Sequence, residues 1–331
     1  MDPVYMIILT VAVALLFDFA NGWNDSANAI ATVVSTRVLS PLSAVLLAGA
    51  LNFVGAFLST KVAKMIGGGL VDPMVLTQTA ILAAMLGAFT WTFVMTLFGL
   101  PISGSHSLIG GLIGAVAFSA GIGALKSGGV YKVLLALFLS PIFGLAIGFF
   151  LMVVLMHLFK KVPLGIVNKY FGKLQLVSVS FMALSHGTND AQKVMGVITM
   201  ALLSGGYIDS LEVPLWVVFS CALMMGLGTA TGGWRVIKTL GCQLSRIQPV
   251  HGFAAESAAS VVLMGSASLG LPVSTTHVIT SSIMGVGATR RLSAVRWGVG
   301  KKIFYAWVFT LPSCGIMAGI YYWVLSMILG G

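Results

Sequence analysis

The chain has 331 residues, of which 58% are hydrophobic and only 8% are charged. A water-soluble domain of this length cannot bury so much apolar surface, so the composition excludes a soluble globular protein and predicts an integral membrane protein. The formal net charge of +10 does not indicate a nucleic-acid partner, because the basic residues lie in short loops between apolar runs, as in cytoplasmic membrane loops.

Apolar segments long enough to cross a bilayer recur along the whole chain. We predict that they are helical, because backbone polar groups in lipid must be satisfied within their own segment. In chain order, the first predicted helices cover residues 4–36, 42–65, 76–99, 101–120 and 131–158. A second set covers residues 175–203, 214–234, 250–270, 272–289 and 303–329.

Two short motifs occur twice, in the same order and at nearly the same spacing. "NGWND" at 21–25 matches "HGTND" at 186–190, and "LPISGSH" at 100–106 matches "LPVSTTH" at 271–277. Two motifs that repeat at similar offsets indicate an internal duplication.

The duplication predicts two repeats, residues 1–165 and 166–331, of about five spans each. An odd number of spans turns the second repeat upside down, and an outside N-terminus then places most of the 18 Lys and Arg residues inside. We therefore predict an all-α polytopic protein of the cell (plasma) membrane with inverted-topology repeats and both termini outside. Such repeats are typical of secondary transporters, whose site lies at the midplane between broken helices or re-entrant hairpins. Segments 101–120 and 272–289 are either full spans or re-entrant hairpins.

The phrase "NGWNDSANA" at 21–29 places Asn24, Asp25 and Asn28 on one helical face within an apolar stretch. An ionised Asp at the bilayer centre costs at least about 2.5–3.5 kcal/mol without a partner. A capped surface turn is the ordinary alternative, but the phrase recurs in the second repeat. We interpret it as a cation site of carboxylate, amide and backbone oxygens. Its mirror partners are Asn189, Asp190 and Gln192.

The Pro-Ser-His phrases predict helix starts, because Pro and Ser or Thr are common at helix N-termini. Unpaired N–H groups and a partial positive charge make such a helix start an anion site. Simple helix capping is the alternative, which the duplication disfavours. The hydroxyl groups at these starts belong to Ser103, Ser105, Ser107, Ser274, Thr275 and Thr276.

Two further charged residues lie within apolar segments. Glu256 in "GFAAESAAS" is either part of an ion site or an interhelical hydrogen-bond partner. Lys193 either pairs with Asp190 at i+3 or faces the pathway. Because neither motif contains Arg, a doubly charged oxyanion needs cations held by Asp25 and Asp190. The residues thus predict cation-coupled uptake of a small oxyanion.

The four motifs closely resemble the signatures of the inorganic phosphate transporter (PiT) family, and the likeness covers nearly the whole chain. The resemblance implies sodium- or proton-coupled phosphate import with an inverted-repeat fold, no enzymatic activity and no cofactor beyond co-transported sodium ions. It implies phosphate contacts from Ser103, Ser105, Ser274, Thr276, Asn24 and Asn189, and the helix-start argument adds Ser107 and Thr275. It implies sodium ligands from Asp25, Asn28, Asp190 and Glu256, to which the mirror-partner argument from the residues adds Gln192.

Expected partners are phosphate, sodium ions and membrane lipids, with no nucleic acid and with a homo-oligomer such as a dimer. The chain departs from the family signature at Gln192 and Lys193, which replace Ala and Asn. We therefore expect an asymmetric second cation site.

Three other functions are alternatives to sodium–phosphate symport. A proton-driven carrier, or a carrier of sulfate or another oxyanion, would share the fold. A membrane enzyme lacks support, because no Walker-type phosphate loop and no His-Glu-x-x-His motif is present. A channel would not require two equivalent halves. Imposed ion gradients distinguish these classes, since only a symporter accumulates its substrate against a gradient.

Overall fold

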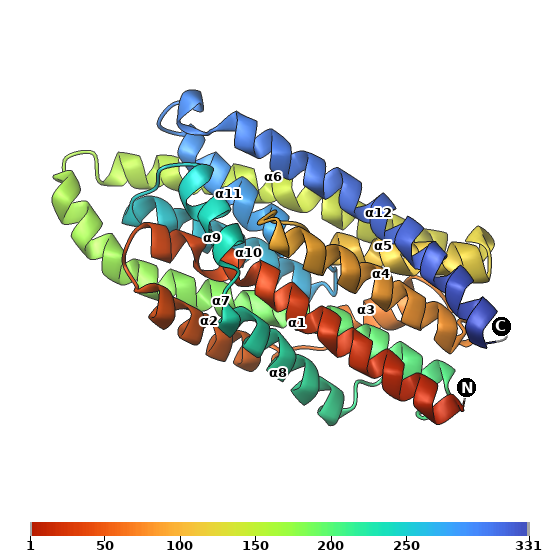
Figure 1. The fold of residues 1–331 in the computed structure, drawn as a ribbon. Helices are drawn as coiled ribbons and strands as arrows, with labels where there is room; N and C mark the ends of the chain where they lie inside the picture. Colours follow the sequence, from red (N-terminus) through yellow and green to blue (C-terminus); the bar gives the residue numbers. More distant parts are fainter. Residues whose placement is uncertain (1, 330–331) are drawn as a thin grey trace.

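The computed structural model describes residues 2–329, and helices dominate this part of the chain (Figure 1). The α-helices are α1 (Pro3–Ser35), α2 (Pro41–Gly55), α3 (Lys61–Gly69), α4 (Gln78–Leu97), α5 (Gly104–Ser119), α6 (Ser127–Leu158), α7 (Leu164–Ser204), α8 (Leu215–Thr231), α9 (Trp234–Lys238), α10 (Pro249–Ser268), α11 (Thr275–Ala288) and α12 (Trp297–Leu329). Three short 3₁₀ helices of the described chain lie between them: η1 (Pro73–Val75), η2 (Ile122–Ala124) and η4 (Leu292–Ala294). The segment η3 (Thr239–Gln243) is π-helical. Between residues 2 and 329 the only β pairing consists of two isolated bridges, so the all-α prediction is confirmed.

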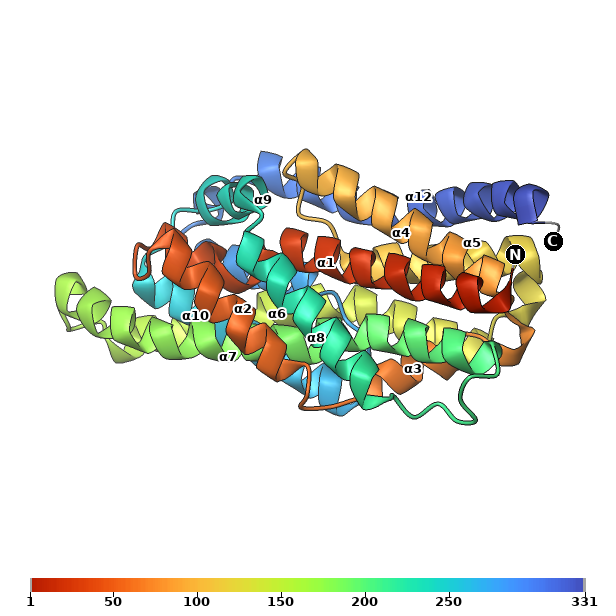
Figure 2. The same cartoon turned by 60° about the horizontal axis from the view of Figure 1, so that its bottom comes forward.

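The long helices run side by side, and the start of α1 lies at the same end of the bundle as the end of α12 (Figure 1). Four described helices, α1, α4, α6 and α12, are long and apolar enough to cross a membrane. Helix α8 and the helical segment after it make a fifth candidate, bent by 61°. Helix α1 packs between α4 and α8 (Figure 2). This arrangement agrees with a multi-pass membrane protein.

Two predicted continuous helices are broken, so those predictions were wrong in detail. The predicted helix 42–65 consists of α2 and α3, and the Gln192 carboxamide oxygen accepts from Val62 N at 2.8 Å at the start of α3. The predicted helix 214–234 ends where Gly232 adopts a φ of 72°, a left-handed conformation suited to glycine. The first break depends on a contact from α7 that the local sequence does not reveal. At the second break the glycines Gly232 and Gly233 are a local signal, and Gly233 N also donates to Ser26 Oγ of α1 at 2.6 Å.

The predicted segments 76–99 and 101–120 form a pair of helices, α4 and α5, and the segments 250–270 and 272–289 form α10 and α11. Non-helical residues join each pair, and Ile102 and Val273 in these joints are buried. Irregular backbone at membrane depth is tolerated only where protein or water covers it. We call the residues 98–107 and 269–278 the two hairpin tips.

The two hairpins pack in a similar way against long helices from elsewhere in the chain. Helix α5 packs against α12, and α11 packs against α6, so each hairpin contacts the last long helix of the other half. Close backbone approach makes this possible: a Cβ on Gly110 would lie 2.3 Å from Leu311 O, and one on Gly285 would lie 2.2 Å from Leu145 O. Small residues at such crossings are typical of helix packing in membranes.

Candidate functional site

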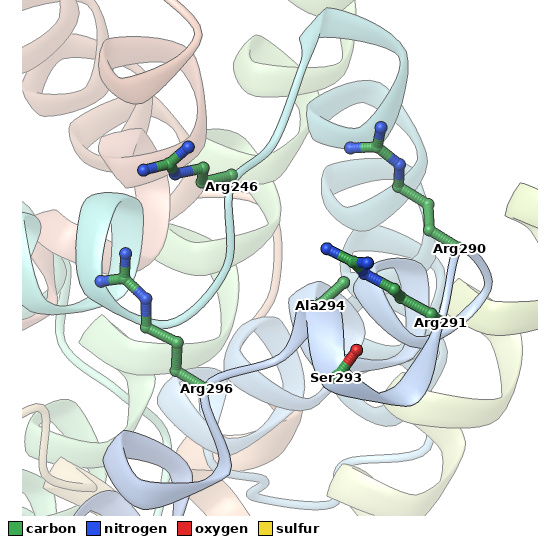
Figure 3. Close-up of a pocket in the computed structure, with 6 residues that line it drawn as sticks. All are labelled: Arg246, Arg290, Arg291, Ser293, Ala294 and Arg296. Atoms are coloured by element: carbon green, nitrogen blue, oxygen red, sulfur yellow. The ribbon is translucent and has the colours of Figure 1, made fainter.

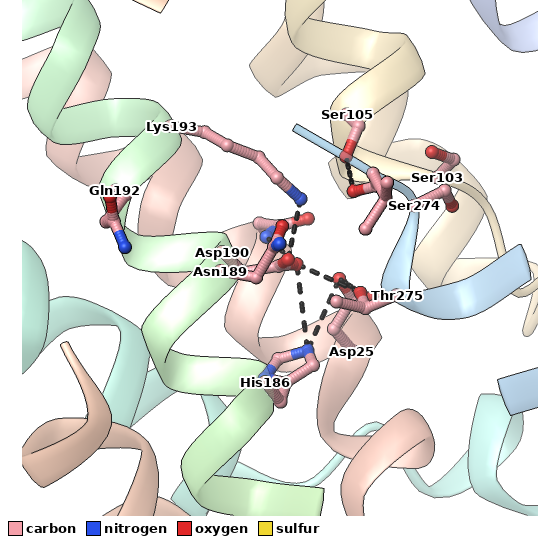
Figure 4. A network of polar contacts seen from close by, with 12 residues as sticks. Asp25, Ser103, Ser105, His186, Asn189, Asp190, Gln192, Lys193, Ser274 and Thr275 are labelled. Atoms are coloured by element: carbon pink, nitrogen blue, oxygen red, sulfur yellow. Dashed lines mark hydrogen bonds and ion pairs between the residues drawn. The ribbon is translucent and has the colours of Figure 1, made fainter. Parts of the chain in front are cut away.

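Two buried aspartates meet at the centre of the bundle. Asp25 comes from α1 and Asp190 from α7, and both are at most 1% exposed. The imidazole of His186 lies between them, with Nε2 3.7 Å from Asp25 Oδ2 and 3.6 Å from Asp190 Oδ2 (Figure 4). One potential ligand atom from each of the three residues lies within 4.8 Å of the others, a spacing compatible with a shared cation. The two copies of the polar phrase therefore form one site.

The start of α11 supplies hydroxyl groups to both carboxylates. Thr276 Oγ1 lies 2.9 Å from Asp25 Oδ1, and Thr275 Oγ1 lies 3.1 Å from Asp190 Oδ2. The amide of Asn28 donates to Thr276 Oγ1 at 3.0 Å. Of the predicted site residues, the structure thus brings together the hydroxyl residues Thr275 and Thr276 with Asp25, Asn28 and Asp190.

The two hairpin tips contact each other by a reciprocal pair of hydrogen bonds. Ser105 Oγ donates to Val273 O at 2.7 Å, and Thr276 Oγ1 lies 2.8 Å from Ile102 O. Because a hydroxyl has one proton, Thr276 donates either to Ile102 O or to the nearby carboxylate of Asp25, not to both at once. This contact therefore connects the tips to the acidic cluster.

Ser103 and Ser274 are the N-caps of α5 and α11. Ser103 Oγ accepts from His106 N at 3.1 Å, and Ser274 Oγ accepts from His277 N at 3.2 Å. Two helix N-termini with their partial positive charges therefore point to the centre of the protein, as expected for an anion site. Ser107 lies one turn into α5 and contacts Thr92 of α4, so its hydroxyl supports the hairpin.

The surroundings of Asp190 and Asp25 differ. Lys193 Nζ lies 2.6 Å from Asp190 Oδ1, with the side chains 3% and 0% exposed, so the i+3 pairing alternative is confirmed. Asn21 donates to Asp190 Oδ2 at 3.3 Å. No Lys or Arg in the described chain pairs with Asp25. Asp190 is therefore paired with the ammonium group of a lysine, whereas Asp25 has only polar groups and an imidazole near it.

Glu256 and Gln192 lie in separate networks. The Glu256 carboxylate accepts from Thr32 Oγ1 at 2.5 Å, from Gln175 Nε2 at 2.9 Å and from Ser178 Oγ. Gln192 points away from the aspartates, toward α3 (Figure 4). Glu256 therefore forms interhelical hydrogen bonds, as the second of the two interpretations predicts.

The two other predicted asparagines connect the central helices to the hairpins. Asn24 donates to Thr96 Oγ1 at 2.8 Å and to Leu100 O at 3.1 Å, and Asn189 lies 3.4 Å from Ser266 Oγ. Four buried amide oxygens near these contacts have no hydrogen-bond partner among the described residues, and they belong to Asn21, Asn24, Asn28 and Asn189. Unpartnered oxygens of this kind are suitable ligands for a hard cation.

Three residues of the cluster were absent from the predicted ligand set: Asn21, His186 and Lys193. The sequence carried a signal for two of them, because i+3 and i+4 neighbours share a helical face. His186 precedes Asp190 by four residues, and Lys193 follows it by three. Asn21 occupies the position in the first motif that His186 occupies in the second.

Broken helices in an apolar bundle that enclose a polar centre are typical of membrane transporters. The family model described as "Phosphate transporter family" matches residues 21–318, and the chain belongs to this family. The predicted family resemblance is therefore confirmed, and the protein is a phosphate transporter rather than an enzyme.

Individual relatives align over nearly the whole chain. A Bacillus subtilis protein named "Probable low-affinity inorganic phosphate transporter" is 46% identical over 97% of this chain and 97% of its own length. A Rhizobium meliloti protein of the same name is 43% identical over 98% of this chain and 97% of its own length. A solved structure titled "The sodium-dependent phosphate transporter" has a TM-score of 0.89 and 24% identity, and the match covers 98% of this chain and 100% of that one. This structural similarity supports the fold.

Proposed function

We propose that the protein imports inorganic phosphate across the cell membrane together with sodium ions, by alternating access. The observation that carries the proposal is the enclosed centre, where the buried Asp25 and Asp190 contact the hairpin tip 269–278, which itself contacts the other tip through Thr276. The solved relative with the same fold is titled a sodium-dependent phosphate transporter, which supports sodium as the coupling ion.

Phosphate binds in this proposal at the contact between the tips. The N-termini of α5 and α11 supply N–H groups and partial positive charge, and Ser105, Thr275 and Thr276 supply hydroxyl donors. Ser103 and Ser274 hold the helix starts in place. Asn24 and Asn189, one residue before the aspartates, support the tips through α4 and α10.

Sodium binds in this proposal at Asp25 and Asn28. Among residues 2–329, Asp25 has no lysine or arginine partner, and the buried Asn28 amide oxygen has no hydrogen-bond partner. Lys193 takes the place of a second cation at Asp190. Gln192 and Glu256 are engaged elsewhere, so this sodium site is smaller than the one predicted from the sequence.

Alternating access requires the halves 1–165 and 166–331 to have opposite orientations. In our proposal α4 with α5, and α10 with α11, enter and leave the membrane by one face, although α4 alone is long and apolar enough to cross it. Each half then crosses the membrane an odd number of times, which turns the second half upside down. Both termini then lie outside. A cysteine introduced at Asp209 should react with an impermeant reagent added outside, and one at Arg296 should not. The reverse pattern would refute this orientation. A homodimer surrounded by lipid is the proposed assembly, which cross-linking in membranes tests.

Uptake of radioactive phosphate into proteoliposomes tests the function. An inward sodium gradient should drive phosphate accumulation above equilibrium, and excess sulfate should compete weakly. Accumulation driven only by a proton gradient would show that the coupling ion is the proton and would refute sodium coupling. Equilibration without accumulation under both gradients would indicate a channel and refute symport.

A further inference from the structure

A cluster of basic side chains lies outside the proposed transport site, at the base of the hairpin formed by α10 and α11. Four arginines line one hollow of about 580 Å³ together with Ser293 and Ala294, and they are Arg246, Arg290, Arg291 and Arg296. Figure 3 shows these side chains around the same opening. We call this hollow the arginine pocket. Its volume falls within the range of about 300–1,000 Å³ that is usual for sites of small organic ligands.

The positive charge of the arginine pocket has no counter-charge in the protein. Between residues 2 and 329, none of its four arginines forms an ion pair with a carboxylate. None of their guanidinium groups donates a hydrogen bond to another described protein group. Each guanidinium has about five N–H donors arranged to bind the oxygens of phosphate or carboxylate. Like charges collected in one hollow repel each other, so an anion stabilises this arrangement.

The other half of the protein provides an internal comparison. An isolated bridge joins Ser245 to Val295 next to the arginine pocket, and an equivalent bridge joins Val71 to Leu125. The backbone hydrogen bond from Arg296 N to Leu244 O measures 2.9 Å, and the equivalent bond from Lys126 N to Leu70 O measures 2.8 Å. The two loops therefore share their backbone architecture.

The side chains of the two loops differ. The positions in the first half that correspond to the four arginines hold Asp72, Ala120, Gly121 and Lys126. This fold therefore does not require arginine at these positions. A general preference for basic residues on the cytoplasmic side accounts for positive charge there. It does not account for four arginines around one hollow, while the nearby lysines, Lys301 and Lys302, do not line it.

We propose that the arginine pocket binds a multiply charged phosphate group, either of a soluble phosphorylated compound or of an anionic lipid headgroup. Its position gives the binding a structural consequence. Arg246 precedes α10, Arg290 and Arg291 follow α11, and Arg296 precedes α12. A bound anion joins both ends of the hairpin to α12, and the tip of the same hairpin carries Thr275 and Thr276. The site itself does not depend on the proposed sodium coupling.

The test compares wild type with the double variant Arg290→Gln/Arg291→Gln. The matched control is Lys301→Gln/Lys302→Gln, which removes the same charge from the same region outside the pocket. If the ligand is a soluble compound, pyrophosphate and ATP should bind to the wild type and to the lysine control in neutral detergent. Their affinity for the arginine variant should be about tenfold lower. Thermal unfolding and calorimetry measure this binding.

Nanodiscs test the lipid source. If the ligand is a headgroup, phosphatidylglycerol should raise the unfolding temperature of wild type and control relative to phosphatidylcholine, with a smaller rise for the arginine variant. Equal responses of wild type and arginine variant to pyrophosphate, ATP and phosphatidylglycerol would overturn the proposal. An equal loss in the lysine control would also overturn it, because diffuse surface charge would then explain the binding.

Discussion

Replacement of Lys193 by asparagine tests whether this lysine fills a cation site. The duplication aligns Lys193 with Asn28, so Lys193→Asn gives the second half the residue that the first half has. In the wild type, the Lys193 ammonium lies 2.6 Å from Asp190 and is almost fully buried. Removing one partner of a buried ion pair costs about 3–5 kcal/mol.

The neighbouring carboxylate increases this effect. Potential ligand oxygens of Asp25 and Asp190 lie within 4.8 Å of each other. Two such charges repel by about 3 kcal/mol at an effective dielectric constant of about 20. The variant therefore has a strong affinity for a replacement cation, and sodium is the available one.

We expect Lys193→Asn to gain sodium dependence. Its thermal stability should fall in choline chloride and recover as sodium replaces choline, because a ligand that binds only the folded state stabilises it. The Hill coefficient for sodium in phosphate uptake should rise by about one. Lys193→Arg should retain the wild-type sodium dependence, and Lys161→Asn, at an exposed loop position, serves as a control. An unchanged sodium response of Lys193→Asn in both assays would refute the idea that Lys193 replaces a cation.

Three other substitutions test the remaining parts of the site. Asp25→Asn should abolish sodium-driven uptake and sodium-dependent stabilisation in detergent, and retention of both would remove sodium from this residue. Ser105→Ala combined with Thr276→Ala should raise the KM for phosphate by about tenfold or more, since each lost hydrogen bond to a charged group weakens binding by about 1.5–3 kcal/mol; an unchanged KM would place the anion elsewhere. Glu256→Gln should lower thermal stability, by about 1–3 kcal/mol in the free energy of unfolding, because three donors face this buried carboxylate. The sodium dependence of uptake by Glu256→Gln should match that of the wild type. A changed sodium dependence would indicate that Glu256 is a sodium ligand.

The sequence predicted the positions of most helices because apolar runs and their polar interruptions are local features. The predicted segment 131–158 lies within α6, and the segment 4–36 differs from α1 by one residue at each end. Depth within the bundle is not a local feature. The residues that join α4 to α5, "FGLPIS" at 98–103, contain no charge, so an apolar sequence alone does not distinguish a hairpin from two spans.

The site was predictable to the extent that it depends on repeated motifs. Asp25 and Asp190 share a motif, and the structure brings them together. Glu256 and Gln192 gave a similar sequence signal, a polar residue in an apolar segment, yet tertiary contacts place them in other networks. The amide oxygen of Gln192 caps a helix whose start exists only because the predicted continuous helix is broken.

The unequal surroundings of the two aspartates bear on how coupling works. With both aspartates ionised, their two negative charges exceed the single positive charge of Lys193, and the centre is then negative before phosphate arrives. A doubly charged phosphate in a low-dielectric site therefore needs at least one mobile cation. The ammonium group of Lys193 is part of α7, so it is not transported and cannot couple phosphate uptake to an ion gradient. In the proposed mechanism only a cation bound at Asp25 enters with phosphate and leaves with it, so the gradient should act through Asp25 of α1, and Lys193 of α7 should supply fixed charge.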